Sequence, residues 1–367
     1  MFNYDNADTF GDGHCQEYYK CDNCFQINKK KCAKLNQWNP RNKQFILSFM
    51  LTDECNQNCQ YCWQKQGCPT YGTFTEENLE KIIDYFYKNY NEYSLVFGVL
   101  GGEPTLYPNL LGKLAEKSYQ LYDKLSMRVY TNGKFEKKDE LLNICDKYEN
   151  ITFQVSDNYD IINYKHFNKY CIASSVVFYE GCKIEDTIAL LKQIKQLGYK
   201  ETVINFDLRR TPLKNPLKYY QTMCQLLEQC ASLADDSFLI NNFIYNDYGI
   251  RSIEDFTPSI NIFPDCKFYL THYIKSTPIG DLNTLIDIKQ LYEPVKNSLC
   301  NNCANHDICT TDINWPFLNA DLSQTKNTNI CLNCLAMNEV TRKLKLDRRG
   351  KPIPIEKQGK FERVGYF

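Results

Sequence analysis

The sequence has no excess of charge of either sign and no long hydrophobic run. Its 367 residues carry 43 Lys and Arg against 44 Asp and Glu, a formal net charge of −1. This balance argues against nucleic acid or a membrane surface as a general partner. The apolar runs are only as long as strands, and no signal-like segment opens the chain, so neither a membrane span nor secretion is predicted. The four histidines form no repeated ligand motif.

Cysteine, in contrast, is abundant, with 19 residues. Without a predicted secretion signal, we expect a cytoplasmic, reducing location. In that location clustered cysteines indicate metal sites more often than disulfides.

Strand-like runs alternate with helical patterns from about residue 40 onward. The six runs are 44–51, 94–100, 127–131, 151–155, 172–178 and 203–208. Thr73 and Glu76 form a capping box that predicts the start of one helix, and Gly198 is predicted to follow the end of another. The alternation predicts an α/β fold with a parallel sheet and right-handed crossovers.

Two motifs follow the first two of these runs. The first, the cysteine triplet in CNQNCQYC, consists of Cys55, Cys59 and Cys62. The second, the GGEP segment, consists of Gly101, Gly102, Glu103 and Pro104. Three thiolates at this spacing cannot close a tetrahedral metal site, but they can hold three irons of a cubane cluster and leave the fourth iron open. The alternative is a zinc knuckle beside an ordinary Gly-Gly turn.

The triplet and the GGEP segment together resemble the radical S-adenosylmethionine (SAM) superfamily. The resemblance implies a (β/α)6 partial barrel over residues 41–240, with small cysteine-rich N- and C-terminal extensions. It implies a 4Fe–4S cluster on the three thiolates, whose open iron chelates the amino and carboxylate groups of SAM. One electron then cleaves a C–S bond of SAM, and the 5′-deoxyadenosyl radical abstracts hydrogen from substrate.

The resemblance also assigns SAM-binding roles. Tyr61 is expected near the adenine. Gly101 and Gly102 are expected to let the backbone approach the methionine moiety, Glu103 to accept a hydrogen bond from its ammonium, and Pro104 to stiffen the turn.

After the third and fourth runs come TNG (131–133) and Ser156-Asp157. They are similar to segments that touch SAM in related maturases, although VSDN departs from the pattern. The alternative is ordinary turn residues. No catalytic side chain or hydrogen donor is assigned.

The C-terminal cysteines resemble the SPASM domain of peptide-modifying radical SAM enzymes. The expected ligands of one auxiliary 4Fe–4S cluster are Cys300, Cys303, Cys309 and Cys331. Leu285 and Ile313 stand where a second cluster would need cysteines. Two alternatives stay open: Cys334 as the fourth ligand, and a structural zinc.

A third group of cysteines precedes the core, and this segment is too small to fold without a metal. Its members are Cys15, Cys21, Cys24 and Cys32. Their spacing does not separate zinc from iron–sulfur. At the other end, the basic segment 342–367 is either a solvated terminus or a docking strip for an acidic leader peptide.

The sequence therefore predicts four parts: a cysteine-rich extension (1–40), a radical SAM core (41–240), a SPASM-like domain (241–341) and a basic tail (342–367). By resemblance to peptide maturases and anaerobic sulfatase maturases, the expected substrate is a peptide or protein. The expected electron donor is a flavodoxin or ferredoxin. The alternatives are a small-molecule or nucleotide substrate in cofactor biosynthesis, or a non-catalytic zinc-binding module.

Overall fold

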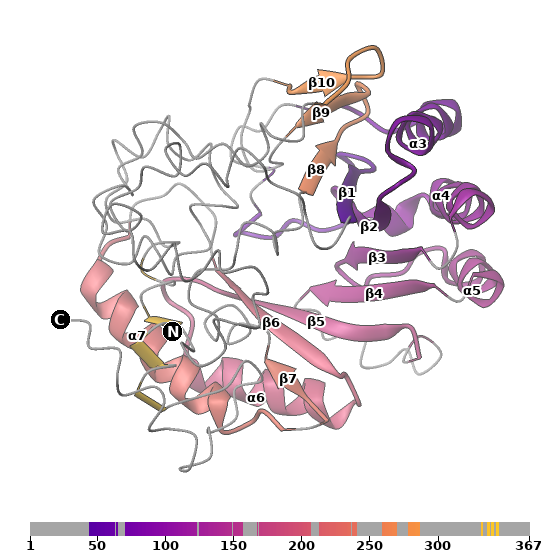
Figure 1. The fold of residues 1–367 in the computed structure, drawn as a ribbon. Helices are drawn as coiled ribbons and strands as arrows, with labels where there is room; N and C mark the ends of the chain where they lie inside the picture. The colour runs from indigo at the N-terminus through magenta and orange to yellow at the C-terminus, as the bar shows by residue number, and fades with distance from the viewer. Residues whose placement is uncertain are drawn as a thin grey trace, which may run out of the picture.

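The computed structural model describes residues 44–62, 64, 70–122, 125–148, 150–156, 167, 169–206, 213–235, 237–240, 259–269, 278–286, 332, 336–337, 339–340 and 343–344. The described residues form one ten-stranded sheet in the order β10-β9-β8-β1-β2-β3-β4-β5-β6-β7 (Figure 1). The strands are β1 (Gln44–Met50), β2 (Ser94–Leu100), β3 (Ser126–Thr131), β4 (Ile151–Ser156), β5 (Cys171–Phe178), β6 (Glu201–Phe206), β7 (Leu239–Ile240), β8 (Ser259–Ile262), β9 (Lys267–Tyr269) and β10 (Gly280–Asp281).

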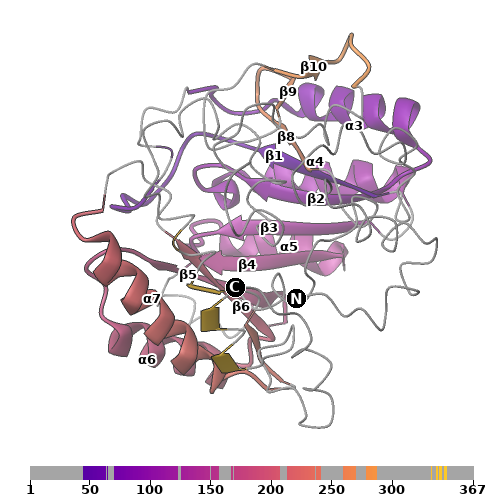
Figure 2. The same ribbon diagram turned by 60° about the vertical axis from the view of Figure 1, so that its left-hand side comes forward.

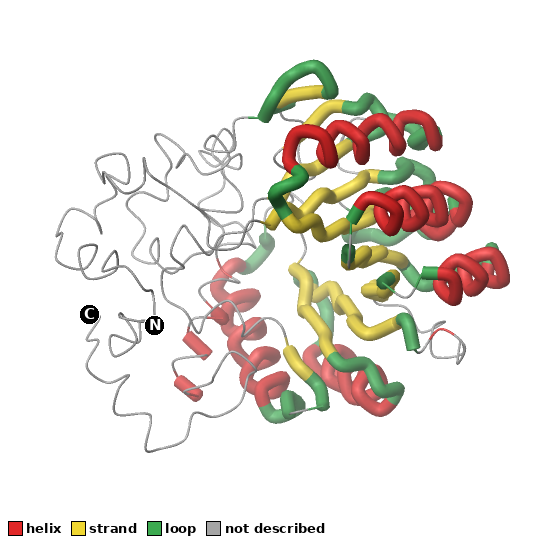
Figure 3. Tube along the Cα trace, turned by 45° about the vertical axis from the view of Figure 1, so that its right-hand side comes forward, coloured by secondary structure: helices red, strands yellow, loops and turns green. Residues whose placement is uncertain are grey.

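Helices connect most of the strands and cover one face of the sheet. They are α3 (Glu76–Tyr90), the short 3-10 helix η5 (Pro104–Leu106), α4 (Pro108–Leu121), α5 (Lys138–Lys147), α6 (Ile184–Gln196) and α7 (Pro216–Ala231). Strands β1 to β7 pair in parallel, β8 pairs in parallel with β1, and only β9 and β10 are antiparallel. Figures 2 and 3 show the helices along one side of the curved sheet. This is the predicted partial barrel, with extra strands at both edges.

Alternation along the strands divides apolar from polar side chains. Successive strand residues point to opposite faces, and Phe49, Phe97 and Val129 are fully buried in the core that packs against the helices. The alternate residues of these strands face the inside of the barrel, and several of them are polar. There Arg128 of β3 forms an ion pair of 2.9 Å with Glu201 of β6, across two intervening strands. The apolar face therefore holds the fold together, and the inner face remains partly polar.

The helix boundaries confirm one predicted signal and correct another. Gly198 lies after α6 with φ +89°, where it donates its N–H to the Lys195 carbonyl. The predicted capping box was wrong, because the N-cap of α3 is Thr75, whose side chain accepts from the Asn78 N–H. Thr73 is not available for that role, since its hydroxyl pairs with the Thr52 hydroxyl at 2.7 Å.

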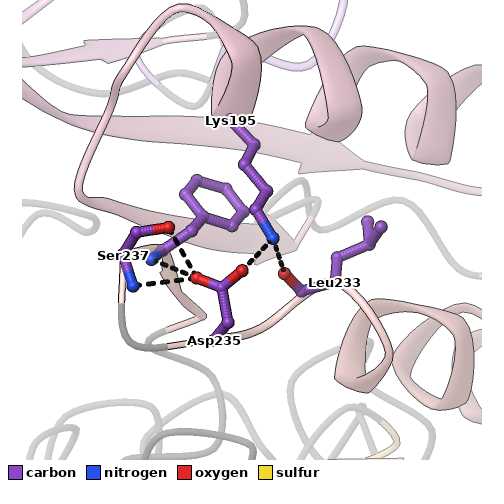
Figure 4. A network of polar contacts seen from close by, with 5 residues as sticks. Lys195, Leu233, Asp235 and Ser237 are labelled. Carbon is purple, nitrogen blue, oxygen red and sulfur yellow. Dashed lines mark hydrogen bonds and ion pairs between the residues drawn. The ribbon is translucent and has the colours of Figure 1, made fainter.

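A polar network fixes the end of α6 to the loop that precedes β7 (Figure 4). Lys195 Nζ donates to the Leu233 carbonyl at 2.8 Å and forms an ion pair with Asp235. The Asp235 carboxylate also accepts from the N–H and hydroxyl of Ser237, at 2.8 and 2.6 Å. The Lys195 ammonium, followed by the Ser237 donors, holds the Asp235 pKa below its usual range. This network lies at the amino ends of the strands.

None of the helices in the described ranges has the length and apolar character needed to cross a lipid bilayer.

Candidate active site

The motif-bearing segments meet because the strands before them are parallel. Met50 pairs with Leu100, Thr131 with Val155, and Ser156 with Ser175, so the carboxyl ends of β1 to β5 lie along one edge. Figure 1 shows the arrowheads of β3 and β4 on the same side of the sheet. In α/β folds this edge is where ligands bind.

The GGEP segment lies directly on the backbone that leads into the cysteine triplet. The N–H of Gly102 donates to the Thr52 carbonyl at 2.6 Å, and the N–H of Glu103 donates to the Glu54 carbonyl at 2.7 Å. A Cβ on Gly101 would lie 2.5 Å from the Thr52 oxygen, and one on Gly102 would lie 2.0 Å from the Glu54 oxygen. The glycines are therefore required by the protein's own backbone, and these two N–H groups are already bonded within the protein.

Glu103 joins the ends of β2 and β3 from a fully buried position. Its Oε1 accepts from the Thr105 N–H, the Thr105 hydroxyl and the Thr131 hydroxyl, at 3.1, 2.5 and 2.7 Å. Its Oε2 accepts from the Asn132 N–H at 2.7 Å. Burial raises the pKa of this carboxyl, and the hydrogen bonds oppose that rise. A carboxylate has about four acceptor positions, so Oε2, with one donor assigned, retains capacity to accept another.

The turn after β3 contacts the start of the triplet. Gly133, at φ +76°, allows the chain to turn directly after Asn132. The Asn132 amide then donates to Asn56 Oδ1 at 2.8 Å and to Cys55 Sγ at 3.8 Å. From the sequence, this turn was expected either to contact SAM or to consist of ordinary turn residues. Its bonds to the cysteine loop connect residues 76 and 77 positions apart, which no local pattern reveals.

The three cysteines of the triplet lie in one loop and form no disulfide. Cys55 is exposed, Cys59 and Cys62 are half-buried, and the Cys62 N–H donates to the Cys59 carbonyl at 3.3 Å. Although Cys55 is exposed as a residue, partial desolvation of its thiol by the surrounding loop raises the pKa of that thiol, the nearby charges of Glu103, Cys59 and Cys62 add to the rise, and a hydrogen bond from the Gln57 backbone opposes it. Nowhere in the described part of the chain do three or more His, Cys, Asp or Glu side chains already form a group that could hold a metal ion. The donor set itself, three soft thiols in one loop, fits an iron–sulfur cluster with one open iron.

Two aromatic groups border this loop. Tyr61 lies against Tyr179, which follows β5, with ring centroids 5.9 Å apart. Next to the start of the loop, Tyr71 packs on Phe263 at 4.3 Å, and Phe263 packs on Tyr269 at 5.0 Å. The sequence predicted only Tyr61; Tyr179 could have been found as an aromatic residue directly after the fifth strand.

The Tyr71 group belongs to a small apolar cluster apart from the main core. Its other members are Met50 and Leu100, the last residues of β1 and β2. This apolar cluster lies beside the cysteine triplet, because the Asp53 carboxylate, two positions before Cys55, accepts hydrogen bonds from the N–H groups of Tyr71 and Gly72. It gives the candidate site an apolar wall, which depends on a segment about 160 positions beyond the GGEP segment.

Ser156 ends β4 and is half-buried at the same edge. The other predicted site residues lie outside the described residues; they are Asp157, Cys15, Cys21, Cys24, Cys32, Cys300, Cys303, Cys309 and Cys331. Among the remaining cysteines, Cys145 and Cys171 are buried, and burial raises the pKa of each to about 12. They are core residues.

Comparisons with known proteins agree with this geometry. Residues 49–209 match the model of the radical SAM superfamily. The solved structure of native anSMEcpe with bound AdoMet is 15% identical with a TM-score of 0.59, covering 82% of this chain and 97% of that chain. That of native anSMEcpe with bound AdoMet and Cp18Cys peptide is 14% identical with a TM-score of 0.58, covering 82% and 97%. At these identities the likeness shows the fold alone. No curated protein sequence matches the chain.

Proposed function

We propose that this chain, whose residues 49–209 match the radical SAM superfamily, is a radical SAM enzyme that cleaves SAM reductively and abstracts a hydrogen atom from a peptide or protein substrate. The superfamily uses a 4Fe–4S cluster and SAM, so the protein is an enzyme and not a zinc-bound module. The observation that carries the proposal is the convergence of the cysteine triplet, the GGEP segment and the turn after β3 at one edge of the sheet.

In this proposal, Cys55, Cys59 and Cys62 hold the cluster, which when bound supplies one electron to SAM. The GGEP segment binds the methionine moiety, where Glu103 Oε2 has an acceptor position left for an ammonium. Tyr61 and Tyr179, whose rings lie 5.9 Å apart, flank the adenine. Ser156 and Asp157 complete the SAM contacts.

The peptide class is supported by the fold. The chain resembles anSMEcpe over most of its length, and two of the matching structures of that protein contain a bound peptide. The partly polar inner face of the sheet, with its Arg128–Glu201 pair, also suits a substrate with polar groups.

The parts outside the core complete the proposal. Residues 41–240 are the radical SAM core, flanked by a cysteine-rich segment at 1–40, a SPASM-like domain at 241–341 and a basic tail at 342–367. We assign one auxiliary 4Fe–4S cluster to Cys300, Cys303, Cys309 and Cys331, and a zinc or iron–sulfur site to the four N-terminal cysteines. A flavodoxin or ferredoxin supplies the electron.

The experiment is an anaerobic assay of SAM cleavage. The reconstituted enzyme is reduced with dithionite and supplied with SAM, and 5′-deoxyadenosine is measured by mass spectrometry. We expect 5′-deoxyadenosine from the wild type and none from Cys59→Ala. Cys145→Ala, which removes a buried thiol from α5, serves as the matched control and should remain active. Absence of 5′-deoxyadenosine from a cluster-loaded wild type would refute the proposal.

The substrate class is tested in the same assay. Pools of cysteine-, serine- and threonine-containing peptides are compared with pools of small metabolites and nucleotides. Stimulation of 5′-deoxyadenosine formation by peptides, together with deuterium transfer from labelled peptide, is expected. Stimulation by small molecules alone would instead support the alternative, a small-molecule or nucleotide substrate in cofactor biosynthesis.

A further inference from the structure

Asn132 is fixed by contacts at both its backbone and its side chain. Its backbone N–H donates to Oε2 of the buried Glu103 at 2.7 Å. Its side-chain Oδ1 accepts from the Lys134 N–H at 2.8 Å, which defines the orientation of the amide. The Nδ2 group therefore points away from its own turn, towards the cysteine loop.

The Nδ2 group bonds to two successive residues of that loop. It donates to Asn56 Oδ1 at 2.8 Å and to Cys55 Sγ at 3.8 Å, a distance within the range of hydrogen bonds to sulfur. The Asn56 amide is oriented as well, because its Nδ2 donates to the Lys134 carbonyl and to Glu136 Oε1, both at 3.0 Å. The pair of amides thus connects the end of β3 to the first cysteine of the triplet.

From this geometry we propose that Asn132 is a positioning residue for Cys55 and that its amide raises the reduction potential of the cluster bound there; the inference rests on the function proposed above. Hydrogen bonds to the sulfur ligands are among the factors that set iron–sulfur potentials. An N–H···S bond stabilises the additional negative charge of the reduced cluster. An asparagine amide does this without adding a charge of its own.

The test uses the full-length, anaerobically reconstituted enzyme. The midpoint potential is measured by electron paramagnetic resonance during redox titration, without SAM or substrate, and the relevant signal is the one that Cys59→Ala abolishes. Asn132→Ala removes the side-chain bonds to Cys55, Asn56 and Lys134 and keeps the backbone bond to Glu103. Asn132→Asp keeps the shape and the contact with Lys134, but it replaces the donor with a negative charge. Asn109→Ala, on α4 and bonded only to Glu76 among the described residues, is the matched control.

We expect potentials in the order wild type, Asn132→Ala, Asn132→Asp, from highest to lowest. A tenfold change in the reduction equilibrium corresponds to about 59 mV for one electron, and we expect about that shift for Asn132→Ala. Asn109→Ala should equal the wild type.

Equal potentials in the wild type and both Asn132 variants would overturn the inference. A purely structural role would change iron content or thermal stability and leave the potential of the remaining cluster unchanged, which also overturns it. Failure of the proposed function is separately visible, because the wild type would then form no 5′-deoxyadenosine.

Discussion

Gly102→Ala should disrupt the contact between the GGEP segment and the cysteine loop. The new Cβ would lie 2.0 Å from the Glu54 carbonyl oxygen and 2.8 Å from that of Asp53, both backbone atoms. Ordinary van der Waals contact starts near 3.4 Å, so the loop must move by about 1.4 Å. The φ of Gly102 is not in the left-handed region, so the effect is steric and not conformational.

The magnitude follows from two contributions. Overpacking costs about 1–3 kcal/mol. The movement also breaks or lengthens the bonds from Gly102 to Thr52 and from Glu103 to Glu54, each worth about 1 kcal/mol. We therefore expect the free energy of unfolding to fall by about 3–5 kcal/mol. Because Glu54 precedes Cys55, iron content should fall as well.

Urea unfolding and iron analysis of the anaerobically reconstituted enzyme measure these effects. Two glycine controls separate the causes. Gly112→Ala in α4 places its Cβ 3.4 Å from the Ile144 side chain and should stabilise the helix by about 0.5–1 kcal/mol. Gly72→Ala, at φ +80° with no atom within 4 Å, should cost about 1–2 kcal/mol by conformation alone. A Gly102→Ala enzyme with wild-type stability and iron content would refute the reasoning.

Three further predictions concern the fold. Thr75→Ala should lower the free energy of unfolding by about 1 kcal/mol through loss of the N-cap of α3; no change in the urea midpoint would contradict the observed helix start. Asp235→Asn should destabilise at neutral pH, because the folded-state pKa of Asp235 is lowered by Lys195 and its carboxylate stabilises the fold above the ordinary pKa of about 4. The difference between wild type and variant should shrink as the pH falls from the ordinary pKa towards the lower folded-state pKa, and a difference that grows on acidification would show the wrong sign. A double-mutant cycle on Arg128 and Glu201 should give a coupling energy of about 1 kcal/mol, since both groups are partly exposed; additive single mutants would argue that the pair is not formed.

The six core strands could be predicted because each alternates or runs apolar for about six residues. The observed strands agree with the predicted runs to within two residues at each end. Strands β7 to β10 could not, because they have only two to four residues and no periodicity. The start of α3 was placed two residues too early, since Thr73 and Thr75 both precede the apolar face and only the tertiary bond to Thr52 distinguishes them.

The candidate site, like the fold, could be predicted only in part from the sequence. Segments directly after parallel strands could be predicted to meet, because parallel topology brings carboxyl ends to one edge. Partners such as Asn56 with Asn132, Tyr61 with Tyr179 and Tyr71 with Phe263 could not, because they lie 76 to 192 positions apart. The role of the GGEP glycines was also larger than the sequence indicated: they make room for the cysteine loop itself.

The central claim is that the loop bearing Cys55, Cys59 and Cys62 supports reductive cleavage of SAM. The most direct measurement is anaerobic incubation of the reconstituted enzyme with dithionite and SAM, followed by quantification of 5′-deoxyadenosine and methionine. The account predicts both products in equal amounts from the wild type and neither from Cys59→Ala. Intact SAM after incubation with a wild-type enzyme that carries its full complement of iron and sulfide would contradict it.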